Sequence, residues 1–139
     1  MNEKKKMEVI QRWLQKAESD VKAAKYLLKV EDAPTDVICF HCQQAIEKYL
    51  KAYLTFRDIR VMKIHDLEVL LNMCVEKDRA FESLEKDKIS SLSSFATEVR
   101  YPDEFYIPSA EEAKESFELA LKVKDFVLKK LGLKASPDQ

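Results

Sequence analysis

The chain has 139 residues, of which 46% are hydrophobic, enough for one domain with a sizeable core. One glycine and four prolines leave little material for the tight turns of a β-hairpin fold. A net charge of −1, with 35% charged residues, excludes nucleic-acid binding by bulk charge, so any such role needs a local basic patch. We expect one domain over residues 1–139, with residues 134–139 forming a frayed tail.

The cysteine count and the N-terminus indicate where the protein resides. Three cysteines are an odd number, and the charged start MNEKKK is not followed by an apolar segment of the secretory type. No apolar run approaches the roughly 20 residues of a membrane span. We therefore expect a cytoplasmic protein without a membrane partner.

Apolar residues at three- and four-residue steps predict a first helix from Glu3 to Leu28. It contains the only tryptophan, Trp13, which we interpret as a core or interface anchor. Pro34 ends this pattern, because residues before proline avoid the α region.

A second helix, from Asp36 to Phe56, is predicted to organise the fold, with Thr35 or Asp36 as its N-cap. Its apolar face covers about half of the circumference at about 100° per residue, so we expect it to be contacted from two or three sides.

The opposite face of this helix forms a polar arc of His41, Gln44, Glu47, Lys48 and Lys51. A solvated surface is one interpretation of the arc. Because the aromatic ring of Phe40 points into it, cover by a second subunit or a ligand is the other. We predict a dimer interface at Phe40 and Gln44.

Three further helices are predicted in the second half of the chain. A short one begins at His65 or Asp66, a fourth runs from about Phe81 to Val99, and the last begins with the capping-box pattern Ser109–Glu112. Gly132 occupies a C′ position after that last helix. The predicted fold is all-α: an up-down four-helix bundle with one additional short helix.

Metal and cofactor sites are not indicated. Cys39, His41 and Cys42 do not share one helix face, and no second Cys or His pair completes four ligands, so we interpret the thiols as part of the core. Neither histidine follows a glutamate at the spacing of a di-metal bundle site, and no glycine-rich loop cradles a phosphate-bearing cofactor.

Cationic side chains are the remaining candidates for chemistry. They leave the second helix, occupy the loop beyond it and follow the fourth helix, and we predict a ligand site at Lys48, Lys51, His65, Arg100 and Tyr101. A structural ion pair of Arg100 with Glu47 or Asp103 is the alternative.

Three stretches resemble the HEPN family, the "higher eukaryotes and prokaryotes nucleotide-binding" domains. They are CFHCQQAIEKYLKAYL, IHDLEVLL and VRYPDEFY, and the opening WLQKAESDVKAAKYLL resembles the first helix of that family. The most specific part lies at Phe40 to Lys51, and the similarity runs from about Met7 to Leu131. The resemblance implies a helical homodimer linked to nucleotides or RNA, often paired with a minimal nucleotidyltransferase in a toxin–antitoxin-like system.

RNA-cleaving members of the family carry an arginine and a histidine with four to six residues between them. Arg100 is present, but Phe, Tyr and Ile occupy positions 105–107, so no histidine is available there as a general acid or base. Arg60 and His65 have the spacing but precede the third helix. The sequence therefore favours a non-catalytic homodimer that binds a nucleotide, RNA or a nucleotidyltransferase. A metal-independent ribonuclease using Arg100 or Arg60 and His65, and a purely structural scaffold, are the alternatives.

Overall fold

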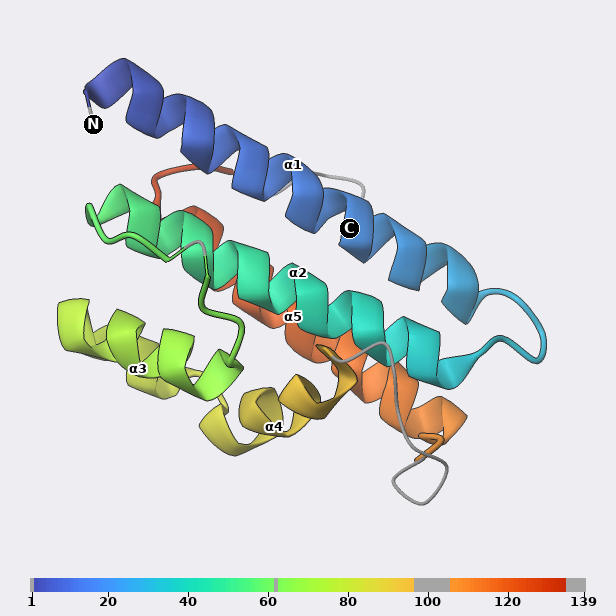
Figure 1. Ribbon diagram of the computed structural model, residues 1–139. Coiled ribbons are helices and arrows are strands. Elements are labelled where there is room, and N and C mark those ends of the chain that lie inside the picture. The colour runs from blue at the N-terminus through green and yellow to red at the C-terminus, as the bar shows by residue number, and fades with distance from the viewer. Residues whose placement is uncertain (1, 62, 97–105, 135–139) are drawn as a thin grey trace.

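The computed structural model describes residues 2–61, 63–96 and 106–134, and all regular structure in these ranges is helical (Figure 1). The elements are α1 (Glu3–Leu28), α2 (Thr35–Phe56), α3 (Leu67–Lys77), η1 (Arg79–Ser83), α4 (Lys86–Ser91), η2 (Leu92–Ala96) and α5 (Ala110–Lys130). The all-α prediction is confirmed. Within the described ranges, none of the helices combines the length and the apolar character that crossing a bilayer requires.

Local capping signals explain most helix boundaries. Asp66 accepts hydrogen bonds from the backbone amides of Glu68 and Val69 in α3, and Ser109 with Glu112 forms the complete capping box of α5. Gly132 follows the C-cap of α5 at φ 75°, in the left-handed region that favours glycine. Thr35 and Asp36 lie inside α2, whose N-cap is Pro34.

The predicted fourth helix over 81–99 is wrong within the described residues, because three short elements replace it. Serine side chains compete for the backbone there: Ser91 Oγ donates to the Lys88 carbonyl at 2.7 Å, and Ser94 Oγ to the Ser91 carbonyl at 3.3 Å. Ser93 Oγ instead accepts from the Leu67 amide at 3.1 Å, which fastens η2 to the start of α3. Residues 97–99 lie outside the described part.

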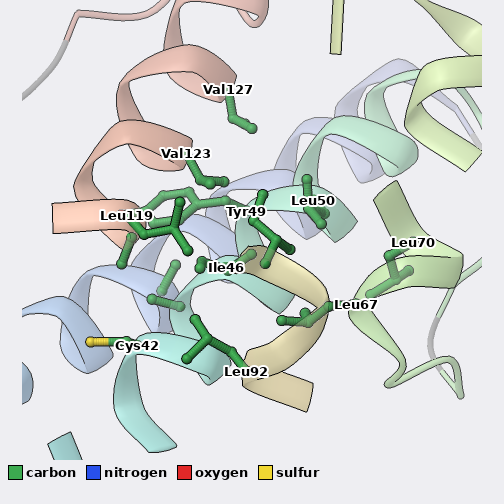
Figure 2. Close-up of a cluster of buried hydrophobic side chains, with 14 of the residues drawn as sticks. Cys42, Ile46, Tyr49, Leu50, Leu67, Leu70, Leu92, Leu119, Val123 and Val127 are labelled. Carbon is green, nitrogen blue, oxygen red and sulfur yellow. The ribbon is translucent and has the colours of Figure 1, made fainter. Parts of the chain in front are cut away.

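Helix α2 is the centre of the molecule, as its broad apolar face predicts. It packs against α1, α5, α3 and η2. Figure 2 shows Ile46, Tyr49 and Leu50 of α2 meeting side chains of α5, α3 and η2 in one buried cluster.

Helix directions differ from the alternation of a simple up-down bundle. Helices α2 and α5 begin at the same end, where Thr35 Oγ1 donates to the Pro108 carbonyl at 2.7 Å. Among the three long helices α1, α2 and α5, α1 runs opposite to α2, so that Lys6 of its first turn lies 3.1 Å from Asp58, just beyond the end of α2 (Figure 1).

Candidate functional site

The polar arc of α2 is largely covered by the chain itself. Glu47 is 4% and Lys51 1% exposed, and Lys51 Nζ lies 5.2 Å from the centre of the Trp13 ring on α1. Phe40, His41, Gln44 and Lys48 are only partly buried. Around Glu47, helix α1 and the segment after α2 therefore cover the arc, which is not solvated there.

A buried carboxylate organises the best-connected part of this arc. Glu47 Oε2 accepts a hydrogen bond from Lys51 Nζ at 3.2 Å and lies 3.2 Å from His65 Nδ1. Gln43 Nε2 donates to Glu47 Oε1 at 3.4 Å, and Gln44 Nε2 donates to Gln43 Oε1 at 2.7 Å. We call these five residues the Glu47 cluster.

The cluster reaches solvent through His65. Its side chain is 66% exposed, against 5% for that of Glu47. An ionised carboxylate only accepts hydrogen bonds, so Nδ1 must carry the proton in this contact. In the neutral imidazole, Nε2 then keeps its lone pair and can accept a proton or a hydrogen bond.

Lys48 belongs to a different cluster from Lys51. Asp20 of α1, which is 8% exposed, pairs with Lys48 Nζ and lies 2.9 Å from His41 Nδ1. The His41 ring meets the Phe40 ring edge to face at 5.4 Å. These contacts join α1 to α2 along their middle turns and hold the Lys48 ammonium away from Glu47.

A third carboxylate, Glu18, joins three helices. It lies 2.6 Å from Lys124 Nζ of α5 and accepts from the Tyr49 hydroxyl of α2 at 3.3 Å. Burial, together with the nearby Glu18 charge, raises the pKa of Tyr49 above its ordinary value. Lys124 is 2% exposed, which explains a lysine in the apolar stripe of the last helix.

The predicted site residues are therefore only partly brought together. Lys51 and His65 share Glu47, whereas Lys48 faces Asp20. Arg100 and Tyr101 lie outside the described residues. Sequence reasoning considered Glu47 only as a partner of Arg100 and missed it as the acceptor for Lys51 and His65. The spacing of Gln43, Glu47 and Lys51 at four-residue steps nevertheless marks one helix edge.

The cysteines behave as core residues, as expected. Cys39, Cys42 and Cys74 are buried, and burial raises the pKa of each thiol, so the reactive thiolate is disfavoured. Cys39 Sγ donates to Ser116 Oγ at 3.6 Å. Across the described ranges, no three potential ligands from His, Cys, Asp and Glu gather to hold a metal ion.

Comparison with known proteins adds the family. The model of the "HEPN domain" matches residues 10–131. The chain is similar to "Putative toxin MJ1304" of Methanocaldococcus jannaschii, with 31% identity over 140 residues that cover 88% of this chain and 90% of the relative. No solved structure matched the chain. With the family model matching most of its length and agreeing with its helical fold, this chain belongs to the HEPN family.

Proposed function

We propose that this protein is the toxin-like member of a two-component system, a homodimer that binds a nucleotide or RNA at the Glu47 cluster and pairs with a minimal nucleotidyltransferase. Family membership and the name of the relative support the toxin–antitoxin-like role. The observation that carries the site is His65, held by a buried carboxylate while most of its side chain faces solvent.

The surroundings of His65 suit a phosphate. Arg60 and Lys63 are exposed in the same segment, and an arginine can bind a phosphate with two parallel hydrogen bonds. Glu47 fixes the imidazole from behind, so that little rotational freedom is lost when a ligand arrives. Arg100 and Tyr101 are proposed to join the site from the chain beyond η2.

Thermal shift measurements with ATP, GTP and a short RNA test this site. A ligand at about 100 times its Kd stabilises the native state by about 2.7 kcal/mol. His65→Ala and Arg60→Ala should reduce that shift, whereas His41→Ala, which removes a histidine from the Asp20 pair, should retain it. A wild type that responds to none of these ligands, and forms no complex with a neighbouring-gene nucleotidyltransferase, contradicts the proposal and leaves the scaffold interpretation.

A second candidate, a metal-independent ribonuclease, is favoured by the Glu47–His65 contact. His65 Nε2 would accept the proton of an RNA 2′-hydroxyl, whose oxygen would attack the adjacent phosphorus and displace the 5′-oxygen of the next nucleotide, which takes up a proton from water. Arg60, or Arg100, would stabilise the charge that develops on the phosphate.

This second candidate is tested with end-labelled RNA in the presence of a chelator. His65→Ala should abolish cleavage, and Glu47→Gln should lower kcat more than it changes KM, because it leaves the imidazole poorly oriented. Cleavage that survives His65→Ala, Arg60→Ala and Arg100→Ala would come from a contaminant and rule the candidate out.

A further inference from the structure

One end of the molecule gathers basic side chains outside the Glu47 cluster. The first turn of α1, the turn after α2, and the ends of α3 and α5 meet there (Figure 1). The ion pairs Lys6–Asp58 at 3.1 Å and Lys130–Asp78 at 2.7 Å join these segments, and Arg57 Nη1 donates to the Lys77 carbonyl at 3.1 Å. The exposed cations of this basic end are Lys4, Lys5, Arg57, Lys77 and Lys129.

Acidic side chains at the basic end do not balance these cations. Asp58 and Asp78 are already paired with Lys6 and Lys130, which leaves Glu3 and Glu76 as the exposed carboxylates of the same turns. Acids concentrate instead at the opposite end, where α2 and α5 begin, with Asp36 in the first turn of α2 and Glu111 and Glu112 in that of α5. Although the net charge is only −1, the charges are therefore unevenly distributed, and the bundle is basic at one end and acidic at the other.

Helix dipoles account for only part of this polarity. Lys77 and Lys129 lie in last turns, where positive charge complements the dipole. Helix α1 runs the other way, so Lys4 and Lys5 lie in its first turn, where positive charge opposes the dipole. Helix stability does not explain these two lysines.

We propose that the basic end binds the phosphate backbone of a nucleic acid strand, on a surface separate from the Glu47 cluster. Its cations come from four chain segments and face outward, which fits a row of phosphates better than a single small anion. The contacts would be to the backbone, so binding is expected to be independent of sequence and strongly weakened by salt. This surface requires neither catalysis nor a bound mononucleotide.

Two triple variants with the same change in net charge test the surface. Lys4→Gln/Lys5→Gln/Lys129→Gln removes cations from the basic end, and Lys16→Gln/Lys22→Gln/Lys29→Gln removes exposed lysines from the rest of α1 and the residue after it. Fluorescence anisotropy with a labelled oligouridylate of about 20 nucleotides, measured between about 50 and 200 mM salt, gives the affinity and its salt slope. Thermal melts followed by circular dichroism show that both variants fold.

The basic-end triple variant should reduce the slope of the logarithm of the binding constant against the logarithm of the salt concentration by about 2. Each lost phosphate contact on a single strand contributes about 0.7 to this slope. Its affinity at about 0.1 M salt should fall roughly 10- to 100-fold, while the control triple stays within about threefold. Equal losses in both variants, no binding by the wild type, or tighter capture by phosphatidylserine vesicles than by oligouridylate would each overturn the proposal. The measurement uses no ATP and no cleavage, so its failure leaves the nucleotide site untouched.

Discussion

Replacing Glu47 by glutamine tests whether the Glu47 cluster is held together by charge. The substitution keeps the shape of the side chain and its contact with Gln43, but it removes the negative charge 3.2 Å from Lys51 Nζ. Lys51 is 1% exposed, so its ammonium cannot turn to water without disturbing α1. Removing one partner of a buried ion pair costs ~3–5 kcal/mol.

Two other contacts adjust this magnitude. The Trp13 ring, 5.2 Å from Lys51 Nζ, continues to stabilise the cation by ~0.5–2 kcal/mol in the variant, which places the expected cost near the lower limit. His65 adds little, because its side chain is 66% exposed and such contacts are worth ~0–1 kcal/mol. For 139 residues, a loss of ~3 kcal/mol lowers Tm by about 10 °C, at ~2.1 cal/mol/K of unfolding entropy per residue.

Urea and thermal unfolding followed by circular dichroism measure this cost. Glu111→Gln, on the exposed first turn of α5, is the matched control and should change stability by less than ~0.5 kcal/mol. The double variant Glu47→Gln/Lys51→Met should recover most of the loss, because it removes both charges of the pair. A single variant as stable as the wild type, or a double variant that loses the sum of both single effects, would refute a charge-coupled cluster.

Three further predictions concern the dimer interface, the dependence of stability on pH at acid pH, and the end of the last helix. Phe40→Asp should shift the sedimentation profile toward monomer, with at least ~2 kcal/mol (about 30-fold) weaker association if Phe40 is an interface anchor, while Val69→Asp on the exposed face of α3 should leave the profile unchanged. The hydrogen bond from Lys130 lowers the pKa of Asp78 in the folded protein, so the unfolded chain binds a proton at Asp78 more tightly. The ionised Asp78 therefore stabilises the folded state above about pH 4, and this contribution is lost as the pH falls further. In Lys130→Gln, the urea concentration at the unfolding midpoint should therefore decrease less steeply with falling pH below about pH 4. The same pH dependence in Lys130→Gln as in a Lys129→Gln control would contradict this prediction. Gly132→Ala should cost ~1 kcal/mol in unfolding free energy, since a methyl group meets no atom within 4 Å and only the φ of 75° is strained, and an unchanged stability would show that the turn relaxes.

The sequence predicts the parts of this fold that depend on local interactions. Helix α1 has the predicted bounds, Glu3–Leu28, and α3 and α5 begin at their predicted caps, Asp66 and Ser109. Each of these boundaries is set by residues within about one turn of chain, which a sequence pattern contains directly.

The region after α3 could not be predicted in the same way. The apolar spacing over 81–99 fits a helix, but the serine hydroxyls between the apolar residues find backbone partners that interrupt it. Ser93 finds its partner in the Leu67 amide, 26 residues earlier in the chain. Tertiary contacts of this kind override a modest helix propensity, and the local sequence does not predict them.

The candidate site was predictable only in outline for a related reason. Periodicity places Glu47, Lys48 and Lys51 on the polar side of α2, which is correct, but it does not show that α1 covers that side. Trp13 and Asp20 of α1 separate the two lysines into different clusters, and those contacts span 38 and 28 residues of sequence respectively.

The carboxylates of Asp20, Glu18 and Glu47 differ in a way that matters for function. Asp20 and Glu18 pair with cations or a hydroxyl held between packed helices, so their contacts fix how α1 lies against α2 and α5. Glu47 alone of the three has a partner, His65, that lies outside the helices and is mostly exposed. A ligand that engages the imidazole would therefore act directly on a carboxylate that also holds Lys51 and Gln43 in the interior. Under the proposed function, this one side chain would couple binding at the surface to the stability of the central helix, and Glu47→Gln should weaken both.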